Sequence, residues 1–178
     1  MMRRRAEVLA AIALCVALAI VGFDLLNVPV RTWEVAVVSA VIGHGGTVSV
    51  VPHHTFQVLP AHHAPFRAHV TPFCSSLVSI LALAGIGLFL LRGSLLRRVG
   101  AVAAAAALIM AGNVLRIAGS LAVGLGLGDG SLVLFHDWVG TLFGLTYTAA
   151  GFFFMLWLLL PSAKDTSLVR AARVSDVL

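Results

Sequence analysis

Charged residues are scarce in this sequence. Only 11% of its 178 residues are charged, whereas 60% are hydrophobic, and the mean hydropathy is +1.05. A water-soluble domain of this length must still present a wetted surface, so the composition excludes an ordinary soluble globular protein. Apolar runs of about 20 residues, the length that a helix needs to cross a bilayer, recur along the chain. The sequence therefore predicts an integral membrane protein.

Cysteine is nearly absent as well, because the chain has only Cys15 and Cys74. Cys15 lies deep in the first apolar run, whereas Cys74 begins the second run at the opposite face of the membrane. A disulfide needs Cα atoms within about 7 Å, which this separation excludes. We therefore expect two free thiols, with Cys74 on the oxidising side of the membrane.

Basic residues are few and lie beside the apolar runs. Four runs predict four transmembrane helices, at about residues 6–26, 74–91, 99–121 and 138–160. The basic clusters precede the first run, separate the second from the third and follow the last, at Arg3 to Arg5, Arg92 to Arg98 and Lys164 onward. Clusters of this kind mark cytoplasmic ends of helices. The net charge of +5 thus reflects membrane topology, and we expect contact with membrane lipid and no nucleic-acid partner.

The same rule orients the whole chain in the plasma membrane. It places both termini and residues 92–98 in the cytoplasm, and residues 27–73 and 122–137 outside. The first run is longer than the core of an ordinary signal peptide and lacks a clean cleavage site, which predicts an uncleaved signal anchor. Residues 1–178 then form a single membrane domain that ends in a flexible cytoplasmic tail from residue 161.

The outer segment 27–73 carries more pattern than a plain linker. Residues 33–42 are apolar but too few to cross a bilayer, which predicts an interfacial or re-entrant helix. Residues 47–51 and 55–59 are rich in β-branched side chains and predict a hairpin, and 68–71 form a third extended piece. The predicted fold class is an all-α polytopic membrane protein with about four transmembrane helices, a small extracytoplasmic helix and a short β-hairpin before the second span.

Three polar residues lie where a membrane helix rarely keeps them. Cys74 stands at the outer entrance of the second span, Arg116 lies within the third, and His136 begins the fourth. At about 1.5 Å per residue from Arg98, Arg116 rises roughly 27 Å through a core about 30 Å thick, level with Cys74. Polar groups at this depth are costly and are functional candidates. We expect all three residues on the outer side of the membrane.

These residue types suit acyl-transfer chemistry. A thiolate can attack a carbonyl, an imidazole can move the proton of the leaving amine, and a fixed cation can stabilise the oxyanion. Asn113 lies one helical turn below Arg116 on the same face, where it can hold the guanidinium. Three carboxylates near the outer surface are alternative partners for Arg116 or His136, namely Asp24, Asp129 and Asp137.

The order Cys74, Asn113-x-x-Arg116 and His136 resembles the exosortase/archaeosortase family of membrane cysteine transpeptidases. The resemblance runs from about residue 30 to 145, and the Asn-x-x-Arg-Ile element is its more specific motif. It implies that Cys74, Arg116 and His136 are catalytic. Asn113 and Ser75 would support them, and Ser76 stands where the family commonly has glycine.

The resemblance also implies a substrate class. The substrates would be exported proteins whose C-terminal sorting signal consists of a short motif, a transmembrane helix and a basic cluster. A short family member of this kind would cut the signal at the outer membrane surface through a Cys74 thioester and pass the product to an acceptor. This chemistry requires neither a cofactor nor a metal.

Two other functions remain open from the sequence. The outer segment holds most of the histidines, at positions 44, 53, 54, 62, 63 and 69, and imidazoles bind zinc, copper and nickel. A metal-binding membrane module is therefore one alternative, although no His-Glu-x-x-His or paired Cys-x-x-Cys motif is present. A catalytically inactive membrane scaffold is the other.

The predicted topology can be tested by cysteine accessibility. In a background without Cys15 and Cys74, a membrane-impermeant thiol reagent added outside the cell should label a His62→Cys variant and spare a Leu95→Cys variant, because only residue 62 is expected outside. The reverse pattern would contradict the prediction that Cys74, Arg116 and His136 lie on the outer side of the membrane.

Overall fold

The computed structural model describes residues 2–43, 47–90 and 94–160. This part of the chain is mostly helical and contains one small sheet. Some of the residues on which the sequence predictions rest lie outside the described residues, among them His44, Arg92 and Lys164.

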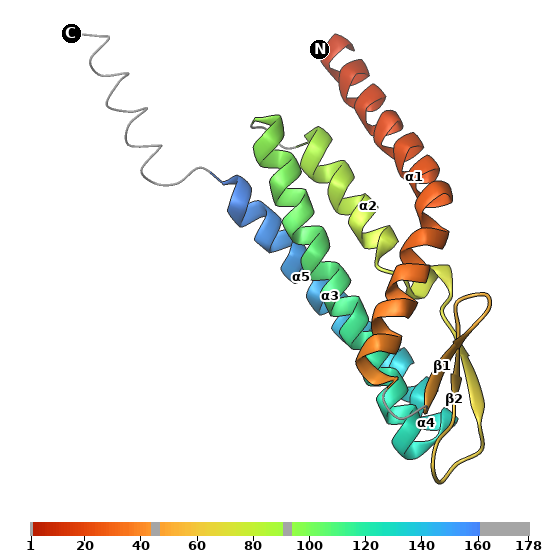
Figure 1. Ribbon diagram of the computed structural model, residues 1–178. Helices are drawn as coiled ribbons and strands as arrows, with labels where there is room; N and C mark the ends of the chain where they lie inside the picture. Colours follow the sequence, from red (N-terminus) through yellow and green to blue (C-terminus); the bar gives the residue numbers. More distant parts are fainter. Residues whose placement is uncertain (1, 44–46, 91–93, 161–178) are drawn as a thin grey trace.

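The first helix is longer than the sequence predicts. Helix α1 runs without a break from Met2 to Ile42, with Pro29 inside it, so the prediction of a span ending at residue 26 and a separate helix at 33–42 was wrong. A proline removes one backbone hydrogen bond but does not have to end a helix, and it commonly bends the axis instead. Figure 1 shows such a change of direction about midway along α1.

A three-stranded antiparallel sheet follows. Strands β1 (Val48–Val51) and β2 (Thr55–Val58) form the predicted hairpin. Strand β3 (Phe66–His69) pairs with β2 and begins two residues before the third extended piece that the sequence predicts at 68–71. The hairpin loop contains His53 and His54 with positive φ values of 65° and 58°. One face of the sheet packs on the second half of α1 and on α3, through buried residues that include Val38, Phe56 and Leu121.

The second predicted span is shorter than expected. A 3₁₀ turn, η2 (Pro72–Cys74), occupies its start, so helix α2 begins only at Leu77 and runs to Gly85, followed by a π-helix, η3 (Ile86–Leu90). The apolar helix Leu77–Phe89 is roughly 20 Å long, less than a bilayer core of about 30 Å. Within the described chain, three helices rather than four are long and apolar enough to cross a membrane: Ile12–Ile42, Leu95–Leu127 and Asp129–Leu159.

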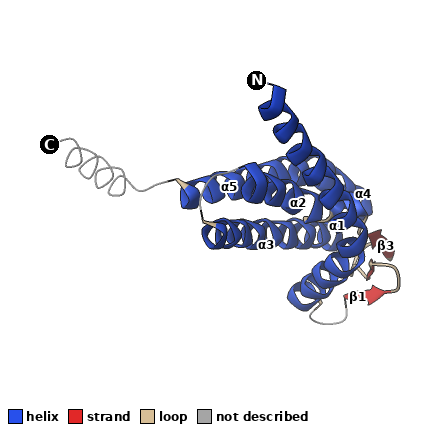
Figure 2. Cartoon of the chain, turned by 90° about the horizontal axis from the view of Figure 1, so that it is seen from above, coloured by secondary structure: helices blue, strands red, loops and turns tan. Residues whose placement is uncertain are grey.

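The remaining helices complete a bundle. Helix α3 (Leu95–Leu127) leads through α4 (Asp129–Leu134) and a π-helix, η4 (Phe135–Val139), into α5 (Gly140–Leu159). Helices α3 and α5 approach closely at Gly112, where an added Cβ would lie 2.6 Å from Cγ of Tyr147. Figures 1 and 2 show α2, α3 and α5 side by side. In Figure 1 the start of α1, the start of α3 and the end of α5 lie at one end of the molecule, and the sheet and α4 lie at the other.

Candidate active site

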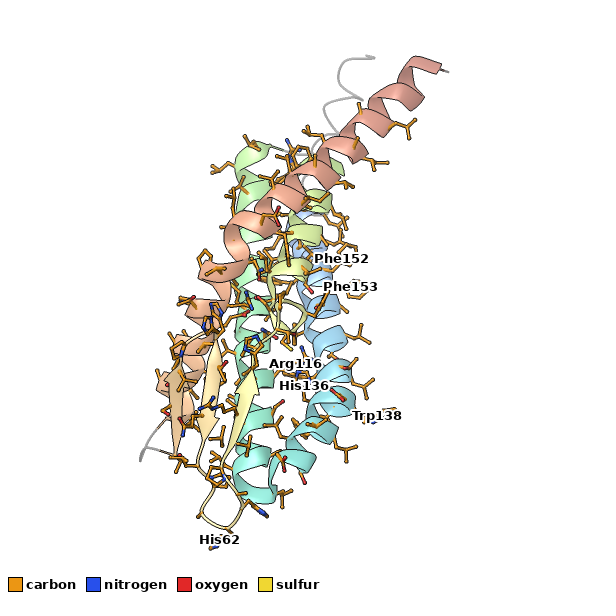
Figure 3. All side chains as sticks on the ribbon, turned by 90° about the vertical axis from the view of Figure 1, so that its right-hand side faces the viewer. His62, Arg116, His136, Trp138, Phe152 and Phe153 are labelled. Carbon is orange, nitrogen blue, oxygen red and sulfur yellow. The ribbon has the colours of Figure 1, made fainter. Side chains whose placement is uncertain are left out.

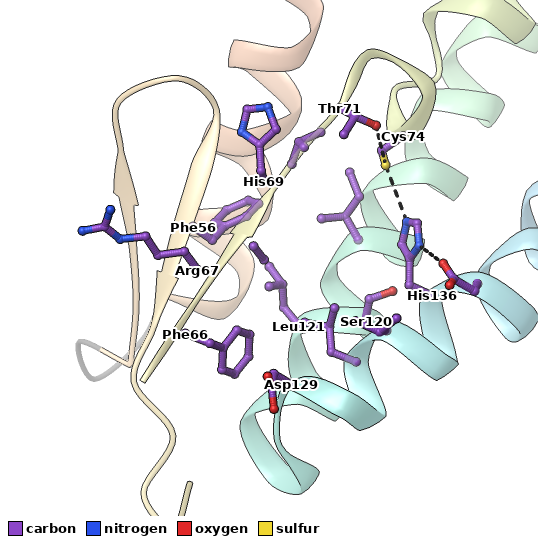
Figure 4. Close-up of a pocket in the computed structure, with 16 residues that line it drawn as sticks. Phe56, Phe66, Arg67, His69, Thr71, Cys74, Ser120, Leu121, Asp129 and His136 are labelled. Atoms are coloured by element: carbon purple, nitrogen blue, oxygen red, sulfur yellow. Dashed lines mark hydrogen bonds and ion pairs between the residues drawn. The ribbon is translucent and has the colours of Figure 1, made fainter. Parts of the chain in front are cut away.

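Cys74, Arg116 and His136 meet in the structure although they come from three elements. Cys74 ends the η2 turn, Arg116 lies on α3, and His136 lies in η4. The Sγ atom of Cys74 is 3.6 Å from Nε2 of His136, and Nη2 of Arg116 is 3.3 Å from the same nitrogen. One imidazole nitrogen therefore contacts both the thiol and the guanidinium (Figures 3 and 4).

Local structure holds each of these side chains. The η2 turn is closed by a hydrogen bond from the Cys74 amide to the Thr71 carbonyl, and Oγ1 of Thr71 lies 3.1 Å from the Cys74 sulfur. The π-helix that carries His136 is of a kind that occurs frequently at functional sites. Gly140 makes room for the arginine, because a Cβ there would lie 3.0 Å from Nε of Arg116.

The hydrogen bonds around His136 define its tautomer. A guanidinium can only donate, so Nε2 must accept from Arg116 and the ring proton belongs on Nδ1. Nδ1 lies 3.2 Å from Oδ1 of Asp137, which can accept that proton. Among the three carboxylates that the sequence leaves open, Asp137 is the partner of His136, whereas Asp129 lines a nearby cavity and Asp24 is exposed on α1. Nε2 thus carries no proton of its own and, at 3.6 Å from the Cys74 sulfur, can take the proton of the thiol.

The Cys74 thiol is more acidic than an ordinary cysteine. Burial raises its pKa, but the sulfur's hydrogen bonds with His136 and Thr71 outweigh the burial, so the pKa falls from 9.0 to about 7. Once Nε2 of His136 has taken the thiol proton, it donates that proton back to the thiolate as a hydrogen bond and stabilises it. A large share of Cys74 is therefore thiolate at neutral pH, the form that acts as a nucleophile.

Asn113 supports the cysteine rather than the arginine. Its Nδ2 donates to the Cys74 carbonyl at 2.9 Å and to Oε1 of Glu34 at 3.0 Å, and its Oδ1 accepts from the Tyr147 hydroxyl at 3.0 Å. The sequence predicts that Asn113 holds the guanidinium of Arg116; in the structure its hydrogen bonds go to these other groups. Ser75 also has a structural contact, since its Oγ accepts from the Leu77 amide at the start of α2.

Glu34 is a site residue that the sequence reasoning missed. Its side chain is 0% exposed, and its Oε1 accepts from the Ser76 amide at 3.0 Å, from the Ser76 hydroxyl at 2.6 Å and from Asn113. The sequence did contain a sign of this role, because Glu34 is the one ionisable residue in the apolar stretch 33–42. An ionisable residue in an apolar helix is costly and usually has a function.

A cavity of about 520 Å³ opens beside Cys74. It lies between strands β2 and β3 on one side and α3, α4 and η4 on the other (Figure 4). Its lining combines apolar side chains with polar groups, and the residues that line it include Phe56, Phe66, Arg67, Ala68, His69, Val70, Thr71, Leu121, Asp129 and Leu132. Pockets of this size typically bind a small ligand or a short peptide segment.

The histidines of the outer segment do not converge. Within residues 2–43, 47–90 and 94–160, no group of three or more His, Cys, Asp or Glu side chains could hold a metal ion. His54 bonds to Thr32 and His69 to Thr55 instead, while His44 lies outside the described residues.

We expect the alkylation of Cys74 by iodoacetamide to rise with pH through a midpoint near 7. His136→Ala should move that midpoint upward, because the thiolate loses its hydrogen-bond donor. The measurement is the alkylation rate against pH by mass spectrometry, in a Cys15→Ser background so that one thiol remains. An unchanged midpoint in His136→Ala would contradict the assigned contact.

Replacing Glu34 should destabilise the hydrogen-bond network that Glu34 forms with Ser76 and Asn113 beside Cys74. Glu34→Ala leaves the buried Ser76 and Asn113 donors without their acceptor, which should cost about 3 kcal/mol of unfolding free energy. Glu34→Gln is the matched control, because its amide oxygen can still accept these bonds. Unfolding in detergent and the Cys74 alkylation rate give the two readouts, and equal stability of both variants would show that the network contributes little.

No family model matches this chain, and neither a curated protein nor a solved structure does. A proposal for the function therefore rests on the geometry of the site and on the order of its residues in the sequence.

Proposed function

We propose that this chain is a membrane-embedded cysteine peptidase or transpeptidase that processes C-terminal sorting signals, as the resemblance to exosortases implies. One observation carries the proposal: Nε2 of His136 lies 3.6 Å from the Cys74 sulfur and 3.3 Å from the Arg116 guanidinium. A base and a fixed cation beside a thiol with a pKa of about 7 are the groups that acyl transfer needs.

The first half-reaction forms a thioester. His136 takes the proton of Cys74, and the thiolate forms a C–S bond with the scissile carbonyl carbon while the carbonyl electrons move to oxygen. Arg116, held against His136, stabilises the oxyanion. When the oxyanion collapses, the C–N bond breaks and His136 gives its proton to the leaving amine.

The second half-reaction releases the product. An acceptor amine, hydroxyl or water attacks the thioester carbonyl as His136 removes its proton, and the Cys74 thiolate leaves. A water acceptor gives hydrolysis, whereas an amine or hydroxyl gives transfer. Asn113 fixes the Cys74 backbone at 2.9 Å throughout both steps, which keeps the sulfur in line with the carbonyl.

The fold suits a substrate that is itself anchored in a membrane. Three apolar helices long enough to span a bilayer would hold the enzyme in the plasma membrane, with the basic clusters in the cytoplasm and the site facing outside. The leaving part of the substrate, a transmembrane helix with a basic end, would then stay in the lipid. The exported part would be released or transferred.

Substitutions at the site separate catalysis from anchoring. Cys74→Ala should abolish release of a tagged exported protein from its C-terminal anchor at unchanged membrane abundance. Arg116→Lys should slow release by about 10²–10³, because an ammonium lacks the planar fork and the permanent charge of the guanidinium. Asn113→Ala should slow release less than Arg116→Lys does, because Asn113 only positions Cys74 through the hydrogen bond to its carbonyl.

Cys15→Ala is the matched control for Cys74→Ala, because both remove one thiol. Cleavage by Arg116→Lys at the wild-type rate would reduce Arg116 to a membrane anchor whose long stem carries its charge to the interface.

A further inference from the structure

The sheet presents an open edge to the cavity. The strand order is β1-β2-β3, so β3 has a neighbour on one side only in the sheet that the structure describes. Figure 3 shows that the strand nearest to α4 is this one. An edge strand carries a row of backbone donors and acceptors that can pair with another extended chain.

The register of the sheet shows which residues of β3 face that edge. The Val70 amide donates to the His54 carbonyl of the hairpin, and Phe56 pairs with Ala68. Residues of an antiparallel strand alternate between pointing toward the partner and away from it. Residues 66, 68 and 70 therefore face β2, whereas the N–H and C=O groups of Arg67 and His69 point outward.

The cavity follows this edge rather than one face of the sheet. Phe66 and Ala68 stand on the face of the sheet that carries Phe56, and Arg67 and His69 stand on the opposite face. Residues from both faces nevertheless line the cavity. This is possible only where the cavity runs alongside the strand.

The edge also leads to the nucleophile. β3 ends at His69, and Thr71, whose hydroxyl contacts the Cys74 sulfur, follows two residues later. In Figure 4 the strand runs toward Thr71 and Cys74 along the cavity. A peptide paired with β3 would therefore approach the sulfur end-on.

We propose that the outward backbone groups of Arg67 and His69 bind the substrate as a fourth strand of the sheet. The bound segment precedes the scissile bond, because the part after it is the membrane helix, whereas the sheet lies at the end of the molecule away from the start of α3 and the end of α5. Backbone pairing supplies affinity for any extended sequence, and the cavity selects side chains. This inference rests on the proposed function.

A peptide electrophile tests the pairing without knowledge of the natural substrate. The probe is acetyl-tetra-alanine with a C-terminal vinyl sulfone, whose vinyl carbon forms a C–S bond with the Cys74 thiolate while water supplies a proton to the neighbouring carbon. A second probe carries N-methyl groups on alternate amides, which removes donors and keeps the electrophile. Each labelling rate in the full-length Cys15→Ser protein is divided by the iodoacetamide rate of the same variant, so changes in thiol reactivity cancel.

N-methylation should slow labelling by about tenfold, the effect of one or two lost backbone hydrogen bonds. His69→Pro removes an outward N–H and should slow the unmodified probe about tenfold relative to His69→Ala, which removes only the side chain. Val50→Pro is the matched control, because the N–H of Val50 points outward at the opposite edge of the sheet. The Leu59 amide donates to the Thr47 carbonyl, so Thr47 faces β2 and, by the alternation along the strand, the backbone groups of Val50 face away from it.

Three results would overturn the inference, and they are distinguishable. Equal labelling by both probes, with normal iodoacetamide reactivity, would reject the fourth strand and leave Cys74 as the nucleophile. Failure of Cys74 to react even with iodoacetamide near pH 7 would reject the proposed function itself. A slowing in Val50→Pro as large as in His69→Pro would show a general effect on the sheet and would also reject the pairing.

Discussion

The site depends on one buried carboxylate. One oxygen of Glu34 accepts hydrogen bonds from the backbone amide and the hydroxyl of Ser76 and from the side-chain amide of Asn113. Asn113 in turn donates to the Cys74 carbonyl and accepts from the Tyr147 hydroxyl. These bonds join α1, α2, α3 and α5 immediately beneath the nucleophile. Removing one member of such a buried network leaves its partners unsatisfied, so the position of Cys74 is coupled to the packing of four helices.

The backbone that carries two of the reactive side chains, Cys74 and His136, is not a regular α-helix. Cys74 ends a 3₁₀ turn and His136 lies in a π-helix, so neither side chain follows the direction that an α-helix would impose. Gly140 lets the Arg116 side chain pass between α3 and the start of α5. The consequence is that the imidazole Nε2 meets both sulfur and guanidinium. The hydrogen bonds of the sulfur with His136 and Thr71 lower the pKa of Cys74 to about 7 despite its burial.

The small sheet connects this centre to the space where a substrate would lie. Its inner face is fixed against α1 and α3 through Val38 and Phe56, both 0% exposed. Its β3 edge remains open along the cavity. A sheet with an open edge beside the cavity can order an extended chain at little cost to itself, because the strand that receives it is already formed. The extension of α1 past Pro29 is what brings the helix under the sheet.

Composition and local pattern determined much of this protein from the sequence alone. The scarcity of charge and the apolar runs predict the membrane helices, β-branched residues predict the hairpin, and polar residues out of place identify Cys74, Arg116 and His136. What the sequence could not decide depends on contacts between distant segments. Helix α1 continues through Pro29 because the second half of it packs on the sheet, and α2 is short because Pro72 and Cys74 form a turn. Asn113 bonds to Glu34 across 79 residues, and only the tertiary structure brings such donors and acceptors together.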